Sequence, residues 1–162
     1  IWGDSSGGHT AVLAGLTCND SIFDTEDYSE YSCSVKGIID YYGVTDITDP
    51  DAFPSTPNHQ KPDRPEGLFI GGKDVNEHPE LALPTIAMEH ISEDKDIPPV
   101  LIFHGTSDRI VSFGQSVKLY EKLSSCGKKV DFYAVFGADH GGPAFWSKEV
   151  LDIVEAFINE NK

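Results

Sequence analysis

The sequence predicts an α/β fold in which helices cover both faces of a mainly parallel β-sheet. Three observations lead to this prediction: strand and helix candidates alternate along the chain, the clearest strand candidate is a continuous apolar run, and glycine-containing loops follow the strands. Strands that alternate with helices form parallel sheets, and strands buried on both faces have near-continuous apolar sequences. At 162 residues the chain has the size of a single domain, which we expect to span residues 1–162.

The strand candidates are residues 1–2, 35–42, 98–105 and 128–136. Segment 35–42 (Val-Lys-Gly-Ile-Ile-Asp-Tyr-Tyr) is rich in β-branched and aromatic residues and ends at Gly43, as expected for a central strand. Segment 98–105 (Pro-Pro-Val-Leu-Ile-Phe-His-Gly) is opened by prolines and closed by glycine, and its unbroken apolar run predicts burial on both faces. Segment 128–136 alternates polar and apolar residues, which is also typical of a strand.

The helix candidates are residues 10–16, 80–88, 115–125 and 145–159. Residues 10–16 predict a buried helix, whereas 115–125 and 145–159 carry apolar side chains at helical spacing. We expect Pro84 to interrupt the helix at 80–88, because proline lacks the backbone N–H that a helix interior needs.

Two long connections lack a regular pattern. Residues 17–34 contain five acidic residues among aromatic ones, and we expect a solvated surface loop there. A calcium site is disfavoured because the carboxylates lack the glycine-punctuated spacing of a calcium loop. Residues 45–66 contain five prolines, Pro57 among them, which predicts little regular structure. Such an insertion after a strand could form part of a cap over a substrate site.

Charge and composition narrow the classes of partner. The 12 Lys and Arg residues against 27 Asp and Glu residues give a formal net charge of −15, which disfavours nucleic acid and anionic membrane surfaces. No apolar run reaches the ~18 residues that a membrane-spanning helix needs. The cysteines, Cys18, Cys33 and Cys126, lack metal-ligand spacing, and we expect neither a metal nor another cofactor. Their odd number favours free thiols over a Cys18–Cys33 disulfide and does not fix the compartment.

Residues 3–7 (Gly-Asp-Ser-Ser-Gly) fit the pattern Gly-x-Ser-x-Gly of a nucleophile elbow. In such an elbow the serine sits on a strained turn between a strand and a helix, so we expect Gly3 and Gly7 to provide room around Ser5. The N–H of Ser6, at the start of the following helix, would be one donor to an oxyanion. The alternative interpretation is an ordinary glycine and serine turn before a helix.

Asp108 and His140 each follow a predicted strand, as Ser5 does. The carboxyl ends of parallel strands meet at one edge of a sheet, where the sites of open α/β sheets lie. A serine hydroxyl needs a base, and the base needs a carboxylate that orients it, so we predict His140 as base and Asp108 as acid. Taken singly, His140 could be a surface-loop histidine and Asp108 a turn or helix-cap residue. Asp139 is the alternative acid, disfavoured because adjacent loop residues rarely orient each other.

The remaining histidines are weaker candidates for a catalytic role, because they lie within a helix, at the end of a strand or in polar segments: His9, His59, His78, His90 and His104. Asp4, beside the serine, is expected to play a structural part. We expect its carboxylate to bond within the elbow or to a loop outside this chain.

Three motifs together resemble the α/β-hydrolase fold: residues 3–9 (Gly-Asp-Ser-Ser-Gly-Gly-His), residues 98–111 (Pro-Pro-Val-Leu-Ile-Phe-His-Gly-Thr-Ser-Asp-Arg-Ile-Val) and residues 137–142 (Gly-Ala-Asp-His-Gly-Gly). The most similar groups are the hormone-sensitive-lipase-like and the feruloyl or acetyl esterase-like families. The resemblance implies a triad with a serine nucleophile and hydrolysis of short-chain acyl esters, acetyl or feruloyl esters of carbohydrate among them. The alternatives are a serine peptidase of the prolyl-oligopeptidase type and a non-catalytic hydrolase-like binding protein.

These families also carry an N-terminal half with the first strands of the sheet. A His-Gly-Gly-type loop in that half completes the oxyanion hole, and nothing in this sequence matches it. With no initiator Met and two strand residues before the elbow, we expect a C-terminal part of such a protein, weakly active or inactive by itself. An open strand edge would favour contact with the missing N-terminal segment or a homo-oligomer.

Overall fold

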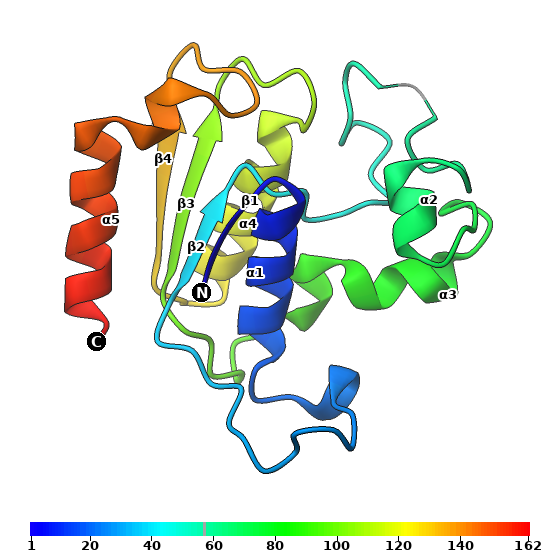
Figure 1. Cartoon of the computed structure of the whole chain (residues 1–162), viewed down its shortest axis with the longest axis horizontal. Coiled ribbons are helices and arrows are strands. Elements are labelled where there is room, and N and C mark those ends of the chain that lie inside the picture. Colours follow the sequence, from blue (N-terminus) through cyan, green and yellow to red (C-terminus); the bar gives the residue numbers. More distant parts are fainter. Residues whose placement is uncertain (57) are drawn as a thin grey trace.

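The computed structural model describes residues 1–56 and 58–162, and a four-stranded parallel sheet lies at its centre (Figure 1). The strands follow one another across the sheet in sequence order: β1 (Trp2–Asp4), β2 (Ile38–Tyr41), β3 (Val100–Gly105) and β4 (Val130–Val135). Each adjacent pair is parallel. The predicted α/β class and parallel sheet are therefore confirmed, and all four strands overlap the predicted segments.

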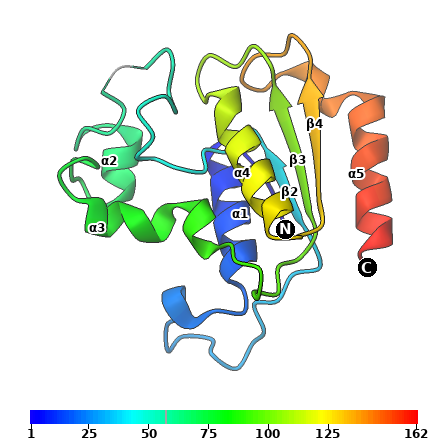
Figure 2. The same ribbon diagram turned by 180° about the vertical axis from the view of Figure 1, so that it is seen from behind.

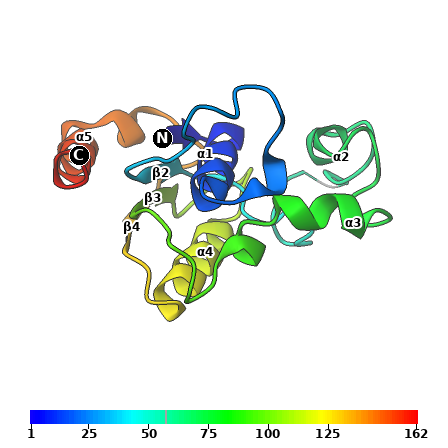
Figure 3. The same cartoon turned by 90° about the horizontal axis from the view of Figure 1, so that it is seen from below.

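Helices cover both faces of this sheet. Helices α1 (Ser6–Thr17) and α4 (Phe113–Ser125) lie on one face, and α5 (Lys148–Glu160) lies on the other (Figures 1 and 3). On the first face the main buried side chains are Val12, Leu16, Ile38, Val100, Ile102, Leu119 and Leu123. On the second they are Ile39, Tyr41, Leu101, Phe103, Phe145, Val154 and Phe157. Odd-numbered residues of β2 and β3 thus face α5, as the two-residue repeat of a strand requires.

Serine side chains cap the two long helices that follow β3 and β4. Ser112 accepts a hydrogen bond from the N–H of Gly114 at the start of α4, and Ser147 accepts one from Val150 at the start of α5. These bonds satisfy backbone donors that have no partner inside the helix. Helix α4 begins two residues earlier than predicted, and α5 begins three residues later, after a 3-10 turn at Pro143–Trp146.

In the described part of the segment between β2 and β3, short helices occur only from Pro65 onward. These are α2 (Pro65–Phe69), α3 (Pro79–Ala82) and 3-10 turns at Leu83–Thr85 and Ala87–His90. The predicted helix at 80–88 is therefore broken near Pro84, as the proline indicated, into one helical turn and two 3-10 turns. In the described part of 45–66 no helix or strand precedes Pro65, and Pro57 lies outside the described residues.

The side chain of Gln115 ties the beginning of this segment to α4. Gln115 is fully buried, and its Oε1 accepts hydrogen bonds from the N–H groups of Thr45 (2.9 Å) and Asp46 (2.8 Å). Its Nε2 donates to Asp49 Oδ2 at 2.7 Å. The described residues of 45–97 extend from the α1 and α4 side of the sheet, away from α5 (Figure 2).

Thr17 is the last residue of α1, and residues 18–34 of the predicted loop form a loop with one 3-10 turn at Ser21–Phe23. The three cysteines are free thiols, as predicted. Among the described residues, no helix combines the length and apolar character needed to cross a membrane. Within the same residues, β1 pairs with β2 alone, and Ile1 and Trp2 beside its open edge are 47% and 40% exposed.

Candidate active site

Ser5 occupies a strained turn between β1 and α1. Its backbone has φ 53° and ψ −121°, a conformation that residues with a side chain rarely adopt. The N–H of Ser5 donates to the carbonyl oxygen of Tyr41 at 2.8 Å, which ties the turn to the end of β2. Such strain persists only where the surrounding structure holds it, and it is typical of functional sites.

Two positions near this turn require glycine, because backbone or side-chain atoms of other residues come too close to leave room for a Cβ. A Cβ at Gly3 would lie 2.0 Å from the carbonyl oxygen of Gly7, and a Cβ at Gly8 would lie 2.3 Å from Asp40 Oδ1. A Cβ at Gly7 would meet Asp4 Oδ1 at 3.9 Å, which is an ordinary contact. The prediction that Gly7 provides room for the elbow is therefore wrong, because the second close approach falls one residue later, at Gly8.

The structure brings Ser5, His140 and Asp108 together in one hydrogen-bonded chain. His140 Nε2 lies 2.8 Å from Ser5 Oγ, and His140 Nδ1 lies 2.8 Å from Asp108 Oδ2. Asp108 lies on the loop after β3 and His140 on the loop after β4. Both residues, like Ser5 after β1, are therefore at the carboxyl ends of the strands, which are the arrowheads in Figure 1. Because a carboxylate only accepts, Nδ1 carries the proton of the second bond and Nε2 can accept the proton of Ser5.

The carboxylate of Asp108 accepts three hydrogen bonds and is also in close contact with His104. Its Oδ1 accepts from the N–H groups of Ile110 (2.8 Å) and Val111 (2.9 Å), and its Oδ2 faces the ring nitrogens of His140 (2.8 Å) and His104 (3.2 Å). Burial by itself would raise the pKa of Asp108, but these hydrogen bonds outweigh burial and lower that pKa well below its ordinary value. Asp108 is therefore charged and fixed in orientation at neutral pH.

Asp139 has a different set of partners. The backbone N–H of Arg109 donates to Asp139 Oδ1 at 3.0 Å, and the guanidinium of Arg109 binds Oδ2. These hydrogen bonds lower the pKa of Asp139 to about 2. The N–H of His140 also donates to Asp139 Oδ1, at 2.9 Å. Asp139 thus ties the loop after β4 to the loop after β3, while the His140 ring faces Asp108.

Asp4 is bound by Tyr42, which follows β2. The hydroxyl of Tyr42 donates to Asp4 Oδ2 at 3.3 Å, so the expectation of a bond within the elbow or to a loop outside this chain is wrong. Burial, with a smaller contribution from Asp4, raises the pKa of Tyr42 to about 12, so the phenol stays protonated. The Tyr42 ring also lies edge-on to the His140 ring, with centroids 4.8 Å apart.

Ser6 is the first residue of α1. In the described part of the chain its N–H donates to no backbone or side-chain acceptor. The amino end of a helix carries a partial positive charge, which favours an anion near this N–H. This is the position that the sequence predicts for an oxyanion donor.

A cavity of about 320 Å³ opens beside the elbow. It is lined by the first turns of α1 and by the segment after β2, through Ser6, Gly7, His9, Thr10, Val44, Ile47, Pro65, Glu66 and Phe69. The segment predicted as part of a cap therefore borders the space next to the serine.

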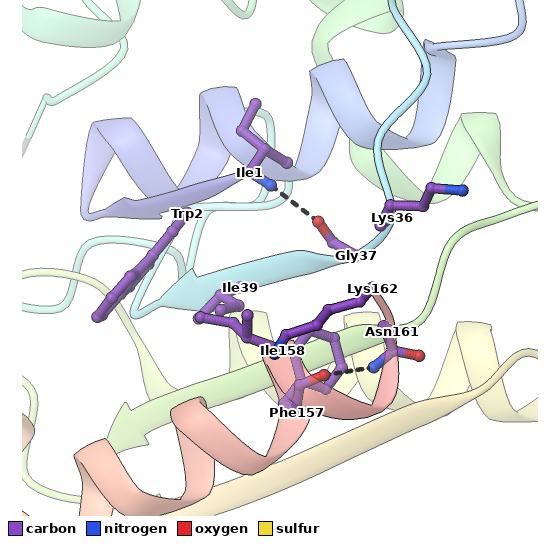
Figure 4. Close-up of a pocket in the computed structure, with 9 residues that line it drawn as sticks. All are labelled: Ile1, Trp2, Lys36, Gly37, Ile39, Phe157, Ile158, Asn161 and Lys162. Atoms are coloured by element: carbon purple, nitrogen blue, oxygen red, sulfur yellow. Dashed lines mark hydrogen bonds between the residues drawn. The ribbon is translucent and has the colours of Figure 1, made fainter.

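A groove of about 340 Å³ lies at the other end of the sheet, between β1 and α5. In Figure 4 the N-terminal amine of Ile1 donates to the carbonyl oxygen of Gly37, and the side chain of Lys162 extends across the groove. Since Ile1 and Gly37 precede β1 and β2, this groove is at the amino ends of the strands, away from Ser5.

Four of the weaker histidine candidates have partners outside the hydrogen-bonded chain of Ser5. His9 Nε2 lies 2.9 Å from the carbonyl oxygen of Thr85, His90 Nε2 lies 2.8 Å from that of Pro84, His78 pairs with Glu80, and His59 contacts Glu66. Within residues 1–56 and 58–162, no three His, Cys, Asp or Glu side chains are placed to hold a metal ion.

His104 is the exception, because it contacts Asp108. It is fully buried at the penultimate position of β3, and sequence reasoning missed its contact with the site. Its signal in the sequence was a histidine inside a buried strand, on the same face as Ile102 and four residues before Asp108.

A parallel sheet with a serine at a strained strand-to-helix turn, followed in order by an aspartate and a histidine beyond later strands, defines an α/β-hydrolase. Residues 1–123 match the sequence model of the BD-FAE family, so the chain belongs to that family. Esterase LipC of Mycobacterium tuberculosis is 29% identical over 143 residues, which cover 87% of this chain and 34% of LipC. The chain thus spans about a third of the length of this curated relative.

Solved structures agree with this fold. A truncated form of a carbohydrate esterase from gut microbiota superposes with a TM-score of 0.83 at 27% identity, covering 99% of this chain and 58% of the other. The propionate-bound esterase Est2 of Thermogutta terrifontis gives a TM-score of 0.69 at 22% identity, covering 98% of this chain and 54% of Est2. The second likeness concerns the fold alone.

Proposed function

We propose that this chain carries the catalytic residues of a serine carboxylesterase, with Ser5 as nucleophile, His140 as base and Asp108 as acid. The single observation that carries the proposal is the chain of two hydrogen bonds, each 2.8 Å long, from Ser5 Oγ through His140 to Asp108 Oδ2. The strained backbone of Ser5 and the free N–H of Ser6 agree with it. LipC is named as an esterase, which favours the same reaction.

In the proposed reaction, Ser5 Oγ attacks the carbonyl carbon of the ester while its proton moves to His140 Nε2. The tetrahedral oxyanion forms beside the N–H of Ser6, and Asp108 stabilises the imidazolium. His140 then gives the proton to the departing alkoxide, which leaves an acyl group on Ser5. Water loses a proton to His140, attacks the acyl group, and releases the acid as the serine regains its proton.

We propose short-chain acyl esters as substrates, with acetyl or feruloyl esters of carbohydrate as the first to test. The cavity of about 320 Å³ beside Ser6 has room for a small group, and apolar side chains of Val44, Ile47 and Phe69 contribute to its lining. One of the similar structures is described as a carbohydrate esterase, which favours a sugar ester.

Covalent labelling tests the proposal directly. A fluorophosphonate probe should add once to the chain, on Ser5, as located by peptide mass spectrometry. Labelling requires one attack rather than repeated turnover, so it remains measurable where turnover is slow. Ser5→Ala should abolish labelling and reduce p-nitrophenyl acetate hydrolysis by about 10³-fold or more.

Ser6→Ala is the matched control, because it removes a neighbouring hydroxyl and keeps the backbone N–H. It should retain labelling and most of the hydrolysis. Labelling that persists in Ser5→Ala, or that maps to Ser6 in the wild-type chain, would contradict the assignment of the nucleophile.

A further inference from the structure

We propose that His104 is a positioning residue for the triad, whose imidazole N–H holds the Asp108 carboxylate in the orientation that His140 requires. The inference rests on the proposed function and concerns a residue that takes no part in the proton transfers. His104 lies on β3, four residues before Asp108, and its side chain is fully buried.

The proton on His104 can be assigned from its neighbours. His104 Nε2 lies 3.1 Å from the carbonyl oxygen of Val111 and 3.2 Å from Asp108 Oδ2. Both oxygens are acceptors, so Nε2 carries a hydrogen. This N–H is hydrogen-bonded to the carbonyl oxygen of Val111 and lies in close contact with Asp108 Oδ2. His104 Nδ1 lies 2.7 Å from Ser116 Oγ, and the Ser116 hydroxyl can donate to it. A neutral imidazole with its proton on Nε2 therefore satisfies every partner of this ring.

The arrangement links helix α4 to the triad. Ser116 is fully buried on α4, and the ring of Phe113 lies edge-on to His104 with centroids 5.6 Å apart. Ser116 fixes the tautomer of His104, and His104 in turn binds the oxygen of Asp108 that faces His140. Two imidazoles thus share Oδ2, one from β3 and one from the loop after β4.

Loss of the His104 N–H should change both the orientation and the charge of Asp108. Oδ2 would keep His140 as its donor, and the carboxylate could rotate about the two backbone bonds to Oδ1. A carboxylate with fewer donors also attracts a proton more strongly and stabilises the imidazolium of His140. The base would therefore become available only at higher pH.

Other titratable groups face these rings, and the test must take them into account. Asp40 on β2 and Tyr42 directly after β2 face His104, with the Tyr42 ring 6.5 Å away, while α4 contributes the hydroxyl of Ser116. His140 is faced by Asp108 and Tyr42. A substitution at His104 leaves all of these groups in place, so a change in the pH profile reports on the lost N–H.

The first experiment measures the rate of fluorophosphonate labelling of Ser5 against pH. In His104→Leu, which has no donor, we expect the acid limb to move up by about one pH unit and the rate at pH 6.5 to fall about tenfold. His104→Gln, whose amide N–H can reach Asp108, should restore most of the rate and of the profile. An acid limb that stays in place in a folded His104→Leu chain would overturn the inference, and so would a His104→Gln chain that behaves as His104→Leu does.

The second experiment needs no substitution at His104. Imidazole ¹⁵N spectra of the wild-type chain should show a proton on His104 Nε2 and none on Nδ1. Ser116→Ala should allow the Nδ1 tautomer to appear. A proton on His104 Nδ1 in the wild-type chain would overturn the inference even if His104→Leu fails to fold. Absence of labelling in the wild-type chain would contradict the proposed function alone, and the tautomer would then decide the role of His104.

Discussion

The two faces of the sheet differ in chemistry although the same strands form both. On the α5 face, Tyr41 and Phe103 pack among aromatic and aliphatic side chains. On the α1 and α4 face, their neighbours Asp40 and His104 are polar and fully buried. Since successive strand residues point to opposite faces, one strand can provide an apolar core and a buried polar layer at the same level.

The two faces therefore contribute in different ways, the apolar face to stability and the polar face to the orientation of side chains. Apolar burial stabilises the fold by about 25 cal/mol per Å², without regard to direction. Buried polar groups lower stability unless they are hydrogen-bonded, but their bonds fix orientations. In the polar layer, His104 contacts Asp108 and Asp40 lies against Gly8 in the first turn of α1, so the layer borders the groups whose orientation matters for the proposed chemistry. We therefore expect substitutions on the α5 face to change stability and those on the polar face to change pH dependence.

The largest expected effect is that of Phe103→Ala on the α5 face. Phe103 is 1% exposed, and truncating such a side chain should lower the free energy of unfolding by about 3–5 kcal/mol. The loss should be similar from pH 5 to pH 8, because no titratable group is removed. Urea unfolding at several pH values measures it, with Phe103→Leu as a milder control.

The rate and pH profile of Ser5 labelling, measured on folded Phe103→Ala, should match those of the wild-type chain. A displaced profile would show that the α5 face also sets the chemistry of the site. The comparison between the two faces would then be wrong.

Asp40→Asn should have a smaller effect on stability that depends on pH. Burial raises the pKa of Asp40 to about 6, and among the described residues its Oδ2 has no hydrogen-bond partner. A raised pKa means that the folded chain holds this proton more tightly than the unfolded chain. The resulting stability is complete below about pH 4 and is lost as the pH rises through about 6.

The asparagine is neutral at every pH, and its Oδ1 can still accept from the N–H of Gly43, now at 3.0 Å. We therefore expect Asp40→Asn to be more stable than the wild-type chain by about 2–3 kcal/mol at pH 8, with the difference shrinking toward pH 4. Unfolding curves at pH 4, 6 and 8 test this. A difference that is constant with pH would mean that Asp40 does not titrate in this range.

Much of the fold could be predicted because it depends on patterns that are local in the sequence. Val100–Gly105 falls within the predicted strand 98–105, and Val130–Val135 falls within 128–136. The proximity of Ser5 to the loops after these strands follows from the common edge of a parallel sheet. The catalytic roles of the three residues stay a prediction.

The remaining features depend on contacts between distant residues. Helix α2 lies where the prolines predicted little regular structure. Bonds between distant residues, such as Ala87 N–H to the carbonyl oxygen of Thr45 at 2.9 Å, hold the described part of the segment between β2 and β3 in place. His104 and Asp108 are only four residues apart, but the hydrogen bond between the His104 ring and Ser116 on α4 joins residues of two different elements. The pattern Gly-x-Ser-x-Gly indicated room at Gly7, whereas the approach of α1 to Asp40 requires it at Gly8.

The smallest expected effect is that of Gly7→Ala, which tests how α1 lies on the polar face. Its methyl group would meet Asp4 Oδ1 at 3.9 Å, and alanine restricts the unfolded chain, so we expect a gain in stability of about 0.5–1 kcal/mol. Gly8→Ala is the matched contrast: its methyl would lie 2.3 Å from Asp40 Oδ1 and 3.0 Å from the carbonyl oxygen of Tyr41, so the chain should become less stable. Thermal unfolding of the two variants measures the difference. Equal tolerance at both positions would mean that α1 is not seated on Asp40, and the polar layer would then lack the close cover that keeps it buried.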